Sequence, residues 1–233
     1  MSDPAQRSFF DGADGRPADP ARAPLDALSY VVVDVETTGG ALRDGHRITE
    51  VCAVRCTAAG EAIDEYHTLV NPLRPIPPYV TRLTNITSPM VAGAPTFREI
   101  AAEFAAFLGS DVFVAHNARF DRAFIDMELG RALGRAPLRE RVLCTVRLAR
   151  KVLPEVRRRS LDSLTYHFGV ENVARHRAYG DARATVQVLA RLLRRVEDRE
   201  IYHWDALRAL LNRRAQRKKR TALPTWCETD EAC

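Results

Sequence analysis

The chain has 233 residues, of which 46% are hydrophobic and 28% are charged. This length suits one α/β domain with short extensions and excludes a second full catalytic domain. The net charge of +5 is unevenly spread, because residues 205–233 hold seven Arg or Lys against four acidic residues. The body of the chain is therefore nearly neutral, and its overall charge indicates no particular partner.

The cysteines and the N-terminal residues indicate in which cellular compartment the protein is expected. The five cysteines are odd in number and include no C-x-x-C pair, so neither a disulfide framework nor a zinc site is predicted. The first residues lack the basic start and apolar stretch of a signal peptide, and no run of about 18 apolar residues occurs. We therefore expect reduced thiols, no membrane segment and a cytoplasmic location.

The first half of the chain predicts an antiparallel meander. Residues 1–27 mix Asp, Gly, Pro, Ala and Arg without a hydrophobic period, which predicts a disordered lead-in. Strand-like runs follow at residues 30–35, 47–56 and 65–70. Residues 71–96 contain six prolines, so we expect mostly loop with a short helix at best.

The second half alternates helices and strands. A helix is predicted over residues 96–108, with Thr96 and Glu99 as a capping box and Gly109 as its end. The further expected elements are strands at 112–115 and 142–145 and helices at 119–133, 146–151, 160–168 and 181–196. This order predicts an α/β fold in which helices flank a mixed central sheet, with a three-strand meander followed by parallel strands.

Two carboxylates close the first strand in the sequence Asp34-Val35-Glu36-Thr37-Thr38-Gly39. Side chains alternate faces along a strand, so Asp34 and Glu36 share one face, about 6 to 7 Å apart. Burying this pair beside an apolar strand is costly unless cations compensate. Oxygen ligands favour Mg²⁺ or Mn²⁺ over zinc, so the pair predicts a divalent cation site.

Two later segments supply further titratable groups. Asp121 falls in the first turn of a helix that follows a buried strand, where the helix dipole favours an anion. Asp181 starts the last long helix, and His176 lies five residues earlier on an expected loop. Four carboxylates carry a formal charge of −4, which two divalent cations would cancel, as in sites that clamp a phosphodiester.

The patterns D-x-E-T-T-G, H-N-A-x-F-D and H-x-x-x-x-D-A stand in this order between about residues 28 and 196. They resemble the three motifs of the DnaQ-like DEDDh exonucleases, and most of all those of the proofreading epsilon subunit of bacterial DNA polymerase III. The resemblance implies a ribonuclease H-like fold and hydrolysis from the 3′ end to release nucleoside 5′-monophosphates. It also implies an exonuclease domain at 28–196 and a helical, basic extension at 197–233.

Carried over by position, the resemblance implies that Asp34, Glu36, Asp121 and Asp181 are the ligands of two Mg²⁺ or Mn²⁺ ions. His176 would be the general base.

Further residues would contact the substrate. The resemblance places Thr37, Thr38, Asn117 and Phe120 near the terminal nucleotide. Thr37 and Thr38 would lie near its sugar and Phe120 near its base. Residues 83–87, LTNIT, resemble an L-x-G-I-T loop in which an apolar side chain wedges against the last base pair, and we assign Ile86 to substrate contact on this basis. Asn85 replaces the usual glycine.

Several alternatives stay open. The leading function is DNA 3′-to-5′ exonuclease in proofreading or repair, with a DNA polymerase subunit as a candidate partner. An RNA exonuclease of the RNase T or oligoribonuclease kind is the alternative, and a non-catalytic interaction module would show at least one broken ligand position, which this sequence lacks. The basic stretch at 213–220 is either a phosphate-binding tail or a solvated helix end.

Overall fold

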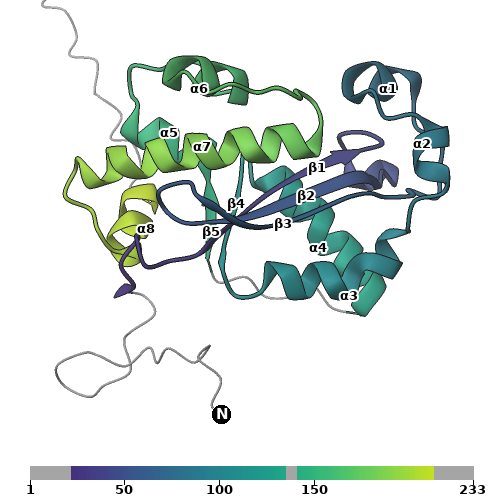
Figure 1. The fold of residues 1–233 in the computed structure, drawn as a ribbon, viewed down its shortest axis with the longest axis horizontal. Helices are drawn as coiled ribbons and strands as arrows, with labels where there is room; N and C mark the ends of the chain where they lie inside the picture. Colours follow the sequence, from purple (N-terminus) through teal and green to yellow (C-terminus); the bar gives the residue numbers. More distant parts are fainter. Residues whose placement is uncertain (1–21, 135–140, 213–233) are drawn as a thin grey trace, which may run out of the picture.

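The structure of the protein is a computed structural model, and it describes residues 22–134 and 141–212. Its centre is a five-stranded sheet in the order β3-β2-β1-β4-β5 (Figure 1). The strands are β1 (Tyr30–Thr37), β2 (Ile48–Cys56), β3 (Ala62–Leu69), β4 (Val112–Ala115) and β5 (Val142–Cys144). β1 pairs antiparallel with β2, and β2 with β3, whereas β4 lies parallel to β1 and β5 parallel to β4. The predicted mixed sheet is confirmed.

Helices cover both faces of this sheet. They are α1 (Pro78–Thr84), α2 (Ser88–Ala92), α3 (Phe97–Leu108), α4 (Arg119–Leu133), α5 (Thr145–Val152), α6 (Leu161–Phe168), α7 (Ala178–Glu197) and α8 (Trp204–Asn212), with a short 3-10 turn, η2, at Leu42–Asp44. The long helix α7 lies along one face with α5 and α6, and α3 and α4 lie on the other (Figure 1).

The two faces of β1 contribute to different parts of the core. Tyr30 and Val32 pack in the cluster under α7, whereas Val31, Val33 and Val35 pack in the cluster with α3 and α4. Because helices cover both faces of the sheet, the sequence of this strand is a continuous apolar run. Because side chains alternate, the residues that follow in the register of Tyr30 and Val32 point toward the α7 side.

The proline-rich segment is more ordered than we predicted from its composition. It contains two short helices, α1 and α2, in place of one at best. Pro78 and Pro89 stand in the first turn of each, where a missing N–H costs nothing and the fixed φ suits a helix. The prolines therefore begin these helices and do not prevent them.

The ordered core reaches beyond the expected bounds of 28 and 196. Leu25, Trp204 and Leu207 are buried in the cluster that contains β1 and α7. The amide of Leu25 donates to the carbonyl of Tyr202 at 2.8 Å, which joins the two ends of the described chain. A composition without hydrophobic period hid these isolated anchors. The predicted lead-in before residue 22 and the basic stretch at 213–220 lie outside the described residues.

Within residues 22–134 and 141–212, Cys52, Cys56 and Cys144 are free. None of the helices described in these ranges has the length and hydrophobicity to cross a bilayer.

The α3 face of the core offers a test of the packing. Phe104 is fully buried, and its ring lies 5.4 Å from Tyr66 and 6.0 Å from Phe97, between ring centroids. Phe104→Ala is expected to lower the free energy of unfolding by about 3 to 5 kcal/mol, measured by urea denaturation. Tyr166→Ala is the matched control, since that side chain is 91% exposed and its loss should change stability by less than about 0.5 kcal/mol. Equal losses in the two variants would contradict this packing.

Candidate active site

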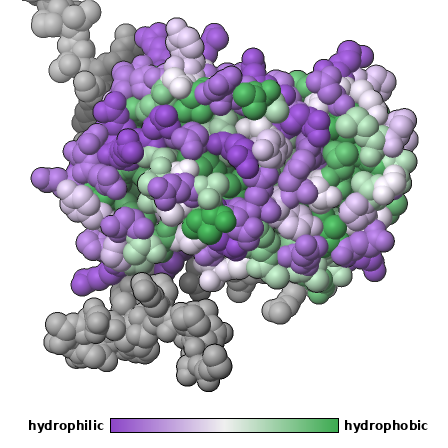
Figure 2. Space-filling view, in the orientation of Figure 1, coloured by the Kyte–Doolittle hydropathy of each residue, from purple (hydrophilic) through white to green (hydrophobic). Residues whose placement is uncertain are grey.

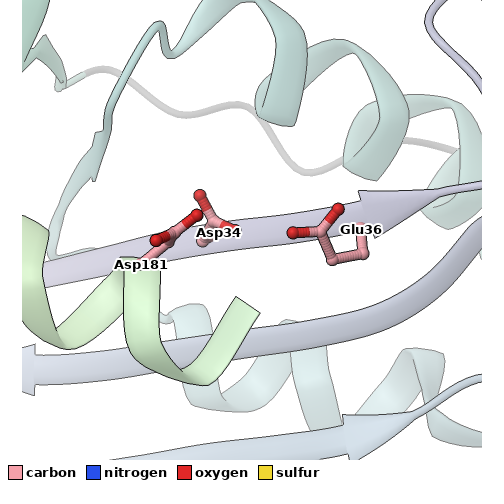
Figure 3. Close-up of side chains that lie close together, drawn as sticks. All are labelled: Asp34, Glu36 and Asp181. Carbon is pink, nitrogen blue, oxygen red and sulfur yellow. The ribbon is translucent and has the colours of Figure 1, made fainter. Parts of the chain in front are cut away.

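Three carboxylates from two distant segments converge on the α7 side of the sheet. Asp34 and Glu36 continue the face of β1 that begins with Tyr30 and Val32, and Asp181 lies in the first turn of α7. One carboxylate oxygen from each lies within 4.8 Å of the others. Figure 3 shows Asp181 reaching from the helix to Asp34, with Glu36 farther along the strand. The structure brings these three predicted residues together, although they are up to 147 positions apart in the chain.

Asp121 approaches the same strand from α4. β4 pairs with β1 only as far as Val32, so the amide of Val35 is left without a β4 partner. The carboxylate of Asp121 accepts a hydrogen bond from this amide at 3.3 Å. Asp121 is buried in the first turn of α4, as predicted, and lies outside the group defined by the 4.8 Å spacing. Its charge nevertheless acts on Asp34.

The crowding of like charges changes their acidity. Loss of hydration raises the pKa of Asp34 well above its usual value, and the negative charges of Asp121 and Glu36 raise it further. Burial, followed by the charge of Asp181, raises the pKa of Glu36 to about 8. Burial raises the pKa of Asp121 to about 7 despite the hydrogen bond from Val35. Burial and the mutual repulsion of these carboxyls therefore both favour their protonated forms.

Asp181 is held by its own segment. Burial raises the pKa of this carboxyl, while the Asn172 amide, the charge of His176 and the backbone of His176 oppose the rise. Asn172 Nδ2 donates to Oδ1 at 2.6 Å, and the amide of His176 donates to Oδ2 at 3.3 Å. The carboxylate is therefore oriented from the loop before α7.

His176 is exposed and lies on this loop, as predicted. Its φ of 58° is left-handed, which costs energy for a residue with a side chain. Gly180 lets the loop pack closely, because a Cβ there would lie 2.1 Å from the carbonyl oxygen of Ala174. The loop is thus seated directly on the first turn of α7.

The predicted threonines lie in the turn that follows β1. Thr38 has no exposed surface, and its hydroxyl accepts from the Arg47 amide at 3.1 Å and bonds to Nδ1 of His46 at 3.1 Å. The His46 ring covers Gly39, where a Cβ would lie 2.4 Å from it. Thr37 is also buried, and its hydroxyl donates to the carbonyl of Gly39 at 2.8 Å. These side chains therefore shape the turn beside the carboxylates.

Asn117 and Phe120 come together in a surface pocket. Both line it with Gly40 and Leu42 from the turn after β1. Asn117 is exposed with a φ of 65°, and the Phe120 ring lies 4.9 Å from that of Phe124, between centroids. The pocket joins the turn after β1 to the first turn of α4, next to Asp121.

Ile86 does not fit its predicted role. Its side chain is fully buried in a small cluster with Ile76, Val80 and Val91 and presents no surface to a substrate in this structure. The apolar side chain of the same loop that faces solvent is Leu83, which is 52% exposed on α1. Figure 2 shows a hydrophobic patch at the right, over α1 and α2. The LTNIT pattern predicted where the loop lies in the sequence, but not which of its side chains are buried and which are exposed.

Three residues near the site escaped the sequence analysis. Asn172 orients Asp181, His46 covers Gly39, and Glu50 lies opposite Glu36 in the register of β1 and β2. Asn172 and His46 gave no local signal, since each belongs to an irregular segment. Glu50 did give one, because it is the only charged residue among the apolar residues of ITEVCAV.

The sheet order and flanking helices define a ribonuclease H-like fold. Exonuclease X in complex with 5′ overhanging duplex DNA matches 78% of this chain and 99% of its own, with a TM-score of 0.60 and 24% identity. The nuclease domain of 3′hExo, a DEDDh family member bound to rAMP, matches 71% of this chain and 92% of its own, with a TM-score of 0.60 and 18% identity. At these identities the likeness shows the fold.

The family follows from the sequence. The family model described as Exonuclease matches residues 31–189, and the chain belongs to this exonuclease family. The match includes all four carboxylates and His176, in agreement with the predicted resemblance.

The curated relatives are longer than this chain. A DNA polymerase III subunit epsilon-like protein of Rhodobacter capsulatus is 41% identical over 74% of this chain and 25% of its own length. A PolC-type DNA polymerase III of Clostridium perfringens is 40% identical over 69% and 11%. A Mycobacterium tuberculosis protein, whose name proposes a bifunctional exonuclease/endonuclease, is 41% identical over 94% and 36%. The chain thus spans about a third or less of these relatives.

The raised carboxyl pKa values predict how stability changes with pH in excess chelator. A group whose pKa is raised by folding stabilises the protein fully below its unfolded value and loses this contribution as pH rises through the folded value. The buried His116 has a lowered pKa and acts in the opposite sense below about pH 6.5, so the melting temperature should fall between about pH 6.5 and pH 8, the upper limit being set by Glu36. Differential scanning fluorimetry measures this fall.

Glu36→Gln should make the fall smaller, because it removes one of the titrating groups. Glu103→Gln, at an exposed position of α3, is the control and should keep the parental slope. A melting temperature that is flat or rises from about pH 6.5 to 8 in chelator would contradict the electrostatic description of the site.

Proposed function

We propose that the protein is a metal-dependent 3′-to-5′ exonuclease that hydrolyses DNA from single-stranded or mismatched 3′ ends and releases nucleoside 5′-monophosphates. The observation that carries this proposal is the convergence of Asp34, Glu36 and Asp181 on the α7 side of the sheet, with Asp121 beside β1. Membership of the exonuclease family supports it.

The donor set fits divalent cations. Asp34, Glu36 and Asp181 would hold them through oxygen atoms alone, with Asp121 as the fourth carboxylate, and such a set favours Mg²⁺ or Mn²⁺. A pair of bound cations supplies a nucleophile at neutral pH and stabilises the charge of the leaving oxygen. The raised pKa values support this fit, because burial and mutual repulsion disfavour the ionised carboxylates unless positive charge lies close to them.

His176 would be the general base. Its side chain faces solvent beside Asp181, so the imidazole can take a proton from the attacking water and release it to bulk solvent. Asn117 and Phe120 would contact the terminal nucleotide in their pocket, with Phe120 near its base, and Thr37 and Thr38 would lie near its sugar. We assign the wedge against the last base pair to Leu83 in place of Ile86.

The proposal extends to the biological setting. The PolC-type and epsilon-like relatives support a role in proofreading or repair, with a DNA polymerase subunit as partner. Residues 28–196 would form the exonuclease domain, followed by an extension at 197–233, and the protein would act in the cytoplasm. RNA is the alternative substrate, favoured by the 3′hExo nuclease domain bound to rAMP.

Replacing His176 tests the general base. His176→Ala should lower kcat by a factor of about 10² to 10⁴, the usual size of general-base catalysis, with metal binding retained. Single-turnover kinetics on 5′-labelled single-stranded DNA in Mn²⁺ measure the effect. His203→Ala is the control, since His203 is exposed beside α8. Turnover near the parental rate in His176→Ala would remove this residue from the reaction.

Replacing Asp34 tests the metal site separately. Asp34→Asn should weaken Mn²⁺ binding by more than about 100-fold in calorimetric titration, since even outer partners of metal ligands contribute about 10- to 100-fold. Asp205→Asn, at an exposed position on α8, is the matched control and should bind Mn²⁺ like the parent. Parental Mn²⁺ affinity in Asp34→Asn would contradict the assigned ligand set.

A further inference from the structure

Glu50 is a buried carboxylate that the proposed reaction does not use. It lies in β2, its side chain has no exposed surface, and it points to the α7 side with Cys52 and Val54. An ionised carboxylate in such a place is costly unless its oxygens are fully hydrogen-bonded. The groups that donate hydrogen bonds to Glu50 therefore indicate which segment it holds in place.

The partners come from the neighbouring strand and from the start of α7. Nε and Nη2 of Arg177 donate to both carboxylate oxygens at 2.7 to 3.2 Å. The amide of Ala178 donates to Oε2 at 2.9 Å, and His67 Nε2 lies 2.8 Å from Oε1. Burial opposes ionisation, but the hydrogen bonds from His67, Arg177 and Ala178 outweigh it and lower the pKa of Glu50 to about 2. Glu50 is thus an anion with its acceptor positions filled.

These contacts grip the segment that carries the proposed base. Arg177 directly follows His176 and caps α7, and Ala178 is the first residue of that helix. Asp181 follows within the same turn. Among the described residues, the ion pair of Arg177 is with Glu50, and the charge of its guanidinium also acts on the nearby Glu36.

The rest of the segment needs such a restraint. His176 has left-handed backbone dihedrals, and strained residues of this kind persist only where the surroundings fix them. The Gly180 contact with Ala174 and the ion pair between Arg175 and Asp162 hold the segment before His176. Glu50 holds the residues directly after His176, so the histidine is fixed from both sides.

We propose that Glu50 is a positioning residue, which aims His176 and Asp181 at the reaction centre by clamping Arg177 and the first amide of α7. This inference rests on the proposed function, in which His176 is the general base and Asp181 a metal ligand. Glu50 itself touches neither substrate nor metal.

Two variants break the clamp from opposite sides. Glu50→Gln removes the charge and half of the acceptor capacity, and Arg177→Gln removes the fork at a side chain that is 30% exposed. At saturating Mn²⁺, each should lower kcat by about 10- to 100-fold with KM nearly unchanged, the usual effect of losing an outer partner of a site. The double variant should have a kcat no lower than that of the less active single variant, because both substitutions remove the same contact between Glu50 and Arg177.

Hydrogen exchange gives a readout that does not depend on activity. In metal-free protein, amides in residues 171–178 should exchange faster in both variants than in the parent. Glu128→Gln is the matched control, because Glu128 is equally buried, accepts a fork from Arg47 and contacts no part of this segment. It should lower the melting temperature and leave exchange at 171–178 unchanged.

Parental kcat in Arg177→Gln, multiplying losses in the double variant, or unchanged exchange at 171–178 would overturn the positioning role. Failure of the proposed function is a different result. In that case His176→Ala would keep parental turnover, while the exchange data would still show whether Glu50 holds the segment.

Discussion

Repulsion among carboxylates gathered on the α7 side of the central strand β1 is the constraint on which the rest of this structure depends. One carboxylate oxygen each of Asp34, Glu36 and Asp181 lies within 4.8 Å of the others, and this spacing is electrostatically unfavourable for partly buried like charges. Strand alternation fixes the first two, and the packing of α7 on β1 fixes the third. The folding energy of a two-sided core holds them there, and protons or divalent cations relieve the repulsion.

The surroundings of the site are organised by a different set of ionic contacts. Glu50 stays ionised where its neighbours on β1 tend toward protonation, because Arg177, His67 and an α7 amide saturate it. On the α4 side, Glu128 and Arg47 form a comparable buried pair between α4 and the residue before β2. Asp34, Glu36 and Asp181 lack cationic partners of this quality among the described residues, and this difference separates a binding site from a structural ion pair.

Much of the fold and the outline of the site followed from the sequence, because they rest on local rules. The apolar run of β1 indicated two-sided covering, and D-V-E placed two carboxylates on one face. Side-chain direction within irregular segments had no such rule. Ile86 and Leu83 lie three residues apart, and only the packing with Ile76 and Val91 shows which one is buried. Contacts between distant segments, such as Glu50 with Arg177, or Trp204 in the core, leave no periodic pattern.

The most direct test of the central claim is degradation of 5′-labelled oligonucleotides by the purified protein with Mg²⁺ or Mn²⁺, alone and in excess chelator. Single-stranded DNA, a mismatched duplex and RNA form the substrate panel. The account predicts a ladder of labelled products that shorten by one nucleotide from the 3′ end, strongest on DNA and abolished by chelator. Undiminished cleavage in chelator, or immediate release of the labelled 5′ nucleotide, would contradict it.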